Sequence, residues 1–176
     1  LQQQTHQTVL EINLNAIVHN LNYFRSCLKP TTKTMVMVKA SCYGNGSYEI
    51  ANILQHNKVD YLAVAFIDEG IELRNAGITL PIIVMNPEYD MLSKLYDYGL
   101  EPNVHNFAVI NELKKLCVTY PNKTFPIHLK MDTGMARYGF QPQQIENLIS
   151  EIKQIPNCTV SSIFSHLAGS DDTQFD

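Results

Sequence analysis

The stretch MVMVKASCYGNG, residues 35–46, decides the fold of this chain. It begins with a short apolar run, residues 35–38, which ends at Lys39 and is followed by a glycine-containing turn. Continuous rather than alternating apolarity is typical of a parallel strand that is covered on both faces. Since parallel sheets are almost always covered by helices, this run predicts an α/β fold.

Strand and helix patterns alternate along the whole chain. Further apolar runs predict strands at residues 61–65, 82–85, 100–104, 125–130 and 159–164. Apolar residues three and four apart predict helices at residues 14–28, 50–54, 71–76, 110–117 and 145–155, and a weaker one at 89–98. Asn15 is predicted to cap the start of the helix at 14–28, and Asp68 the start of the helix at 71–76. Gly77 is predicted to end the helix at 71–76. The alternation predicts right-handed βαβ units in a parallel sheet.

Two parallel architectures fit this pattern, an open doubly wound sheet and a (β/α)8 barrel. No G-x-G-x-x-G follows the first strand, which counts against a dinucleotide site. A complete barrel typically has about 250 residues, whereas this chain has 176 residues and about six strand signals. Residues 1–176 therefore read as one incomplete domain.

The composition argues against several classes of protein. The formal net charge is −4 and no run of Lys and Arg occurs, so we expect no nucleic-acid or membrane partner. No apolar stretch approaches the roughly 18 residues of a membrane span. The 4 cysteines form no C-x-x-C pair and the 6 histidines form no zinc pattern. We expect no disulfide framework, no metal site and a cytoplasmic location.

Candidate reactive groups follow the predicted strands, where active sites of parallel α/β folds collect. Lys39 ends the first strand, Lys130 ends the fifth with Arg137 shortly after it, and His166 follows the sixth. Burial disfavours a charged lysine, and a neutral amine can form a Schiff base with an aldehyde. Tyr43 and the glycines after it offer a phenol and backbone amides to a phosphate. Taken one at a time, these features also have simpler explanations: a solvated lysine at the end of a strand, an ordinary turn, or a structural histidine.

Taken together, these segments resemble the alanine racemase family. VKASCYGNG, residues 38–46, resembles the family signature VKANAYGHG around the lysine that binds pyridoxal 5'-phosphate (PLP). LKMDTGMARYG, residues 129–139, resembles a second signature, LKMDTGMGRLG. Other segments in the family's order and spacing are residues 62–66, 68–70 and 165–168, and the resemblance runs from about Thr8 to the C-terminus.

The resemblance implies a partial (β/α)8 TIM-type barrel, with about six of eight strands and without the family's C-terminal β-domain. It also implies PLP-dependent interconversion of L-alanine and D-alanine by two bases, which supplies D-alanine for peptidoglycan. In the family, a tyrosine of the β-domain is donated by the partner subunit of a homodimer as the opposite-face base. We therefore expect this chain to be inactive alone. The sequence of the lysine signature is most similar to that of fused proteins in which a cell-wall ligase precedes the racemase.

The resemblance also implies roles for the candidate residues. Lys39 would hold PLP through a Schiff base and act as the base on one face of the substrate α-carbon. Tyr43 would bind the cofactor phosphate. Arg137 would contact the cofactor's phenolic oxygen and orient the substrate carboxylate. Lys130 matches a lysine that is often carbamylated, and His166 would position an arginine beneath the pyridine ring.

The chain departs from the family signatures at Ser41, Cys42, Asn45, Ala136 and Tyr138. The rival interpretations are another barrel-type PLP enzyme, such as an amino-acid decarboxylase or a serine or lysine racemase, and a non-catalytic PLP-binding protein. The second signature favours alanine. A further hypothesis is that six strands alone form a poorly closed barrel, whose two open edges lead to self-association.

Overall fold

The computed structural model describes residues 8–155, 157–170 and 172. Its strands are β1 (Met35–Met37), β2 (Tyr61–Val64), β3 (Ile82–Val84), β4 (Glu101–Val104), β5 (Phe125–Lys130) and β6 (Cys158–Phe164). Its helices are α1 (Leu14–Ser26), α2 (Lys39–Gly44), α3 (Ser47–His56), α4 (Ile67–Asn75), α5 (Leu92–Asp97), α6 (Phe107–Thr119) and α7 (Ile145–Lys153), with 3-10 turns η1 (Tyr89–Met91) and η2 (Pro142–Gln144). None of the helices in these ranges is long and apolar enough to cross a membrane.

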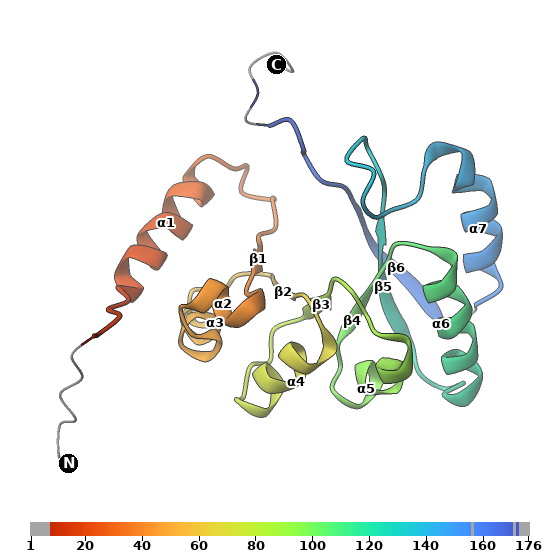
Figure 1. The fold of residues 1–176 in the computed structure, drawn as a ribbon, viewed down its shortest axis with the longest axis horizontal. Coiled ribbons are helices and arrows are strands. Elements are labelled where there is room, and N and C mark those ends of the chain that lie inside the picture. The colour runs from red at the N-terminus through yellow and green to blue at the C-terminus, as the bar shows by residue number, and fades with distance from the viewer. Residues whose placement is uncertain (1–7, 156, 171, 173–176) are drawn as a thin grey trace.

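The six strands form one parallel sheet in which each strand pairs with its neighbours in the chain, in the order β1-β2-β3-β4-β5-β6. Figure 1 shows them following one another across the molecule, from α1 at one end to α7 at the other. A doubly wound sheet reverses its strand order at a switch point, whereas a barrel does not. The consecutive order therefore confirms the partial barrel. Within the described ranges, β1 and β6 each pair with one strand.

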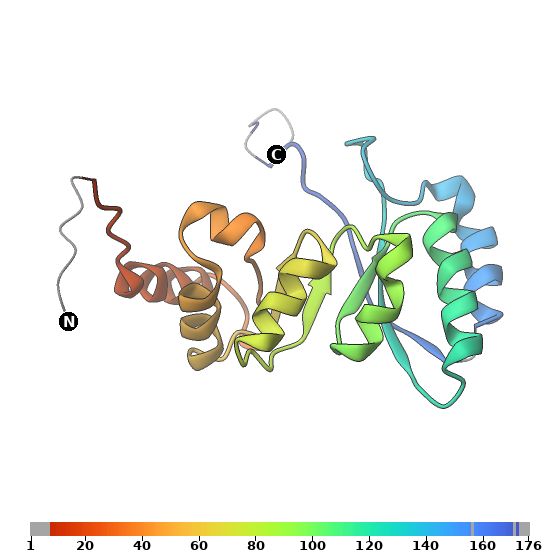
Figure 2. The same cartoon turned by 60° about the horizontal axis from the view of Figure 1, so that its bottom comes forward.

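The core lies between the strands and the helices, which Figure 2 shows along one side of the sheet. Leu62, Val64, Ile82 and Val84 are fully buried and belong to one cluster with apolar residues of the helices. All of β3 and all of β2 except Tyr61 are buried, which agrees with their continuous apolar runs, whereas β6 at the edge of the sheet is largely exposed. Among the helix residues of the cluster are Ile50, Leu54, Ile67, Leu73, Leu95, Ile110, Leu113 and Leu148.

Two predicted helix caps are each wrong by two residues. Helix α1 begins at Leu14, and its cap is Asn13, whose Oδ1 accepts from the backbone N–H of Asn15 at 3.0 Å. Helix α4 begins at Ile67, so Asp68 lies inside its first turn. Near α1 two asparagines could serve as the cap and only the backbone geometry selects Asn13, whereas the cap position of α4 is Phe66, which has no polar side chain to mark it. Gly77, with φ of +92°, follows the end of α4 as predicted.

The turn after β1 is a left-handed helical turn and not the simple glycine turn that we expected. Ala40, Ser41, Cys42 and Tyr43 have φ of 51°, 52°, 50° and 57°. Left-handed geometry costs a residue other than glycine about 1–2 kcal/mol, and it rarely occurs in runs. Burial of the Cys42 side chain and a hydrogen bond from the Cys42 N–H to the Val38 carbonyl (3.2 Å) help to hold the turn.

A glycine should be tolerated in this turn and not in an ordinary helix. Ser41 and Ser150 are both exposed, but Ser150 lies inside α7. We expect Ser41→Gly to leave the free energy of unfolding unchanged or to raise it by up to about 1 kcal/mol, because glycine removes the left-handed strain. Ser150→Gly should lower it by about 0.5 kcal/mol. Urea denaturation followed by circular dichroism measures both, and equal losses in the two variants would contradict the left-handed turn.

Candidate active site

A cavity of about 410 Å³ lies at the carboxyl ends of the strands. Each of the six strands, or the residues directly after it, contributes to its wall, because parallel strands in chain order end at a common rim. The lining residues are Met37, Lys39, Tyr43, Ala65, Met85, Asn86, Asn103, Lys130, Met131, Asp132, Thr133, Met135, Arg137, Tyr138 and His166.

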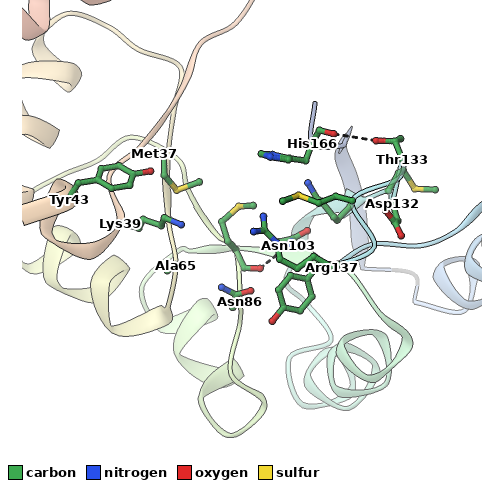
Figure 3. Close-up of a pocket in the computed structure, with 15 residues that line it drawn as sticks. Met37, Lys39, Tyr43, Ala65, Asn86, Asn103, Asp132, Thr133, Arg137 and His166 are labelled. Atoms are coloured by element: carbon green, nitrogen blue, oxygen red, sulfur yellow. Dashed lines mark hydrogen bonds between the residues drawn. The ribbon is translucent and has the colours of Figure 1, made fainter. Parts of the chain in front are cut away.

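The five residues predicted from the sequence all line this one cavity. Figure 3 shows Lys39 and Tyr43 on one side, and Arg137 and His166 on the other. The ammonium group of Lys39 and the imidazole of His166 point into the space between the two sides. Residues that are about 90 to 130 positions apart in the chain are thus brought together, whereas their roles toward a ligand remain predictions.

Lys39 lies directly after the buried Val38, at the start of the left-handed turn, and its side chain is half-buried. Tyr43 lies at the end of the same turn and its side chain is 64% exposed, so its hydroxyl is available at the rim of the cavity. The turn therefore presents an amine and a phenol from the same short segment.

The loop after β5 folds back on itself and returns Arg137 to the cavity. The Phe140 N–H donates to the Lys130 carbonyl at 2.9 Å, and the Asp132 N–H donates to the Phe140 carbonyl at 3.0 Å. Gly139 makes this closure possible: a Cβ there would lie 2.6 Å from the Asp132 nitrogen, and its φ is +120°.

Asp132 organises the tip of this loop. Its Oδ1 accepts from the backbone N–H groups of Gly134 at 3.1 Å and Ala136 at 3.0 Å. These two hydrogen bonds lower the pKa of the Asp132 carboxyl, because they favour its charged form. The loop is also fixed to the end of β6, since the Thr133 hydroxyl lies 2.5 Å from the Ser165 hydroxyl and donates to the His166 carbonyl at 3.3 Å.

The surroundings of Lys130 favour the neutral form of its amine. Burial lowers the pKa of its amine, the positive charge of Arg137 lowers it further, and Asp132 acts in the opposite direction. Its Nζ lies 4.7 Å from the centroid of the Phe164 ring on β6. Three basic side chains, Lys39, Lys130 and Arg137, thus line one cavity, which suits a ligand that carries negative charge.

Sequence reasoning missed Asn103, which is 2% exposed on β4 and lines the cavity. Its Nδ2 donates to the Met85 carbonyl at 2.9 Å, whereas its Oδ1 has no partner in the described part of the chain. An unpaired buried acceptor is costly, so a ligand donor or a water is expected there. A polar residue within the short strand 100–104 was the signal that could have found it.

A buried polar cluster lies deeper in the barrel, and it was also missed. His128, 1% exposed, stands two residues before Lys130 on the same face of β5. Its Nε2 lies 2.6 Å from the Glu101 carboxylate and its Nδ1 lies 2.7 Å from the Ser162 hydroxyl. Both ring nitrogens are satisfied, so the cluster links β4, β5 and β6 beneath the cavity.

The fold and the cavity together define a (β/α)-barrel protein with a basic ligand site at the carboxyl ends of its strands. The family described as "Alanine racemase, N-terminal domain" matches residues 12–176, and the chain belongs to this family. An alanine racemase of Clostridium kluyveri is 38% identical over 93% of this chain and 42% of that protein. One of Methanococcus maripaludis is 36% identical over 96% of this chain and 46% of that protein. The chain thus spans less than half the length of these relatives.

Solved structures agree with this assignment. An alanine racemase of Clostridium difficile 630 superposes with a TM-score of 0.85 at 32% identity, over 92% of this chain and 43% of that one. The alanine racemase of Bartonella henselae "with covalently bound pyridoxal phosphate" has a TM-score of 0.80 at 28% identity, over 89% of this chain and 46% of that one.

The reactivity of Cys42 reports on the turn that carries Lys39. Burial, and secondarily the charge of Glu69, raises the pKa of the Cys42 thiol to about 11. At pH 8 we expect iodoacetamide to label the exposed Cys27 and to spare Cys42, because the thiolate is the nucleophile. Labelling of Cys42 should rise about tenfold per pH unit until pH 11 is approached.

Peptide mass mapping measures the labelling at each cysteine. The urea-unfolded chain is the control, in which both cysteines should react readily at pH 8. Equal labelling of Cys27 and Cys42 in the folded chain at pH 8 would contradict the burial of Cys42.

Proposed function

We propose that the full-length protein interconverts L-alanine and D-alanine with PLP, and that this chain supplies its cofactor-binding half. The observation that carries the proposal is that residues from two separate signatures, Lys39 and Tyr43 in one and Lys130 and Arg137 in the other, line the same cavity. Membership of the alanine racemase family supports the assignment, and the name of the Bartonella henselae structure supports the choice of cofactor.

The residues of the cavity fit PLP in charge and in chemistry. Lys39 offers a half-buried amine that can bind the cofactor aldehyde. The exposed hydroxyl of Tyr43 can donate to the phosphate at the rim, and Arg137 can donate to the phenolic oxygen. When bound, PLP withdraws electrons from the α-carbon of an attached amino acid and so makes its proton removable.

The chain's own groups then bind the substrate and move its proton. Arg137 orients the substrate carboxylate by a charge-assisted, two-point contact. The Nζ of Lys39 would remove or return the α-proton on one face of the substrate. We propose that the tyrosine of the family's C-terminal domain acts on the opposite face, donated by the partner subunit of a homodimer. His166 would position an arginine beneath the cofactor ring.

We propose that Lys130 is carbamylated. Carbon dioxide adds to a neutral amine with release of a proton, and the lowered pKa of Lys130 increases the neutral fraction at a given pH. The resulting anion can pair with Arg137 and hold its guanidinium toward the cavity.

Replacing Lys39 tests the function. In the full-length protein, Lys39→Ala should abolish the pyridoxyl adduct formed by PLP and borohydride, and should lower racemisation of L-alanine at least about a hundredfold. Lys33 is an exposed lysine just before β1, and Lys33→Ala is the matched control. This variant should keep both the pyridoxyl adduct and the racemase activity. Peptide mapping locates the adduct and chiral chromatography measures the product. Retained activity in Lys39→Ala would contradict the assignment, and faster turnover of L-serine or L-lysine would identify a different substrate.

Carbamylation can be detected with ¹³C-bicarbonate. The full-length protein at pH 8 should show a carbamate carbon resonance that weakens as the pH falls, because protonation of the amine prevents the reaction. Lys130→Met should lose this resonance, whereas Lys33→Met should retain it. A signal that persists in Lys130→Met would place the carbamate elsewhere.

A further inference from the structure

The carboxylate of Glu69 joins the ends of the first two strands. Glu69 lies in the first turn of α4 and is half-buried. Its Oε1 accepts from the Ala40 N–H at 2.7 Å, next to β1. Its Oε2 accepts from the N–H groups of Ala65 at 2.6 Å and Phe66 at 3.2 Å, next to β2. One side chain therefore holds three backbone amides from two loops at the rim of the cavity.

The Ala40 amide is the one that matters for Lys39, because it belongs to the Lys39–Ala40 peptide bond. The peptide unit is planar, so fixing the direction of its N–H fixes ψ of Lys39 and φ of Ala40 together. Of these two angles, ψ of Lys39 sets the direction of its Cα–Cβ bond relative to the held peptide. Ala40 is also the first of four left-handed residues, with φ of 51°, which a free chain seldom adopts.

We propose that Glu69 is a positioning residue for Lys39: its carboxylate holds the Lys39–Ala40 peptide so that the Lys39 amine points into the cavity. The inference deepens the proposed function and rests on it, since it gives Lys39 the role of the cofactor-binding lysine. Glu69 touches neither substrate nor cofactor in this account and acts only through the backbone. The same carboxylate raises the pKa of Cys42, two residues further along the turn, which agrees with its place beside the turn.

Glutamine cannot replace Glu69, although it has the same shape. Both oxygens of Glu69 accept from backbone N–H groups, whereas glutamine has one oxygen and one NH2 group. In either orientation the NH2 group faces an N–H donor, so one of the two strand ends is released. Aspartate keeps two accepting oxygens on a side chain shorter by one methylene.

Glu88, which lies directly before η1, provides a matched control at the start of the same helix. Its Oε2 accepts from the Ile67 N–H at 3.2 Å, so within the described residues it caps α4 through a single oxygen. Glu88→Gln can keep this bond with its amide oxygen. The two glutamine variants therefore remove the same charge close to the same helix start, and only Glu69→Gln releases the peptide of Lys39.

The experiment compares the full-length wild type with Glu69→Gln, Glu69→Asp and Glu88→Gln. We expect Glu69→Gln to slow borohydride-trapped labelling of Lys39 by PLP and to lower kcat, each at least about tenfold, with a smaller change in KM. Labelling of Cys42 at pH 8 should increase in this variant as the turn loosens. Glu69→Asp should recover part of kcat, and Glu88→Gln should match the wild type in all these measurements.

Wild-type kcat and labelling in Glu69→Gln, or equal losses in Glu69→Gln and Glu88→Gln, would overturn the inference. If Glu69→Gln does not fold, Glu69→Asp decides: a kcat loss with unchanged melting temperature supports positioning, and an unchanged kcat overturns it. Failure of the proposed function looks different, because the wild type itself would then form no adduct at Lys39.

Discussion

The site depends on one constraint, the pairing of parallel strands in the order of the chain. Each crossover helix returns the chain to the same end of the sheet, so every strand finishes at a common rim. Lys39 and Lys130 reach this rim from β1 and β5, which pair with different neighbours and lie far apart in sequence. The helices bury the outer face of the sheet and leave the carboxyl ends free for polar groups. The residues that line the cavity therefore lie at one edge of the sheet, whereas the apolar residues that stabilise the fold lie between the sheet and the helices.

Polar groups inside the barrel follow from the same arrangement. Complete barrels of this kind are filled mainly by branched apolar side chains, yet His128, Glu101 and Ser162 form a hydrogen-bonded cluster beneath the cavity. A buried polar cluster is tolerable only when its members are satisfied, and both nitrogens of His128 have partners. Asn103, the register partner of His128 on β4, differs because its Oδ1 has no partner among the described residues. The interior therefore holds a satisfied histidine beside a buried acceptor that needs a ligand or a water.

The sequence predicted the order of the elements and the five candidate residues, because apolar periodicity and strand ends are local features. Apolar periodicity could not choose between barrel and open sheet, since both use the same βαβ units; the family resemblance implied the barrel, and the strand order confirms it. The left-handed turn was invisible because Ala40 to Tyr43 contain no glycine to mark positive φ. Glu69 looked like an ordinary residue in the first turn of a helix, since its three acceptor contacts lie with two separate loops. Such features depend on tertiary packing, which a linear pattern does not encode.

The hydroxyl of Thr133 couples the two loops on the far side of the cavity. It contacts the Ser165 hydroxyl and the His166 carbonyl, so movement of the segment that carries Arg137 relative to the segment that carries His166 would break these hydrogen bonds. A ligand that immobilises Arg137 therefore also removes conformational entropy from the segment around His166. A contact of the same ligand with the segment around His166 then costs less entropy, because that segment is already ordered. The ligand contacts at Arg137 and at the His166 segment thus become cooperative without any change in the mean structure.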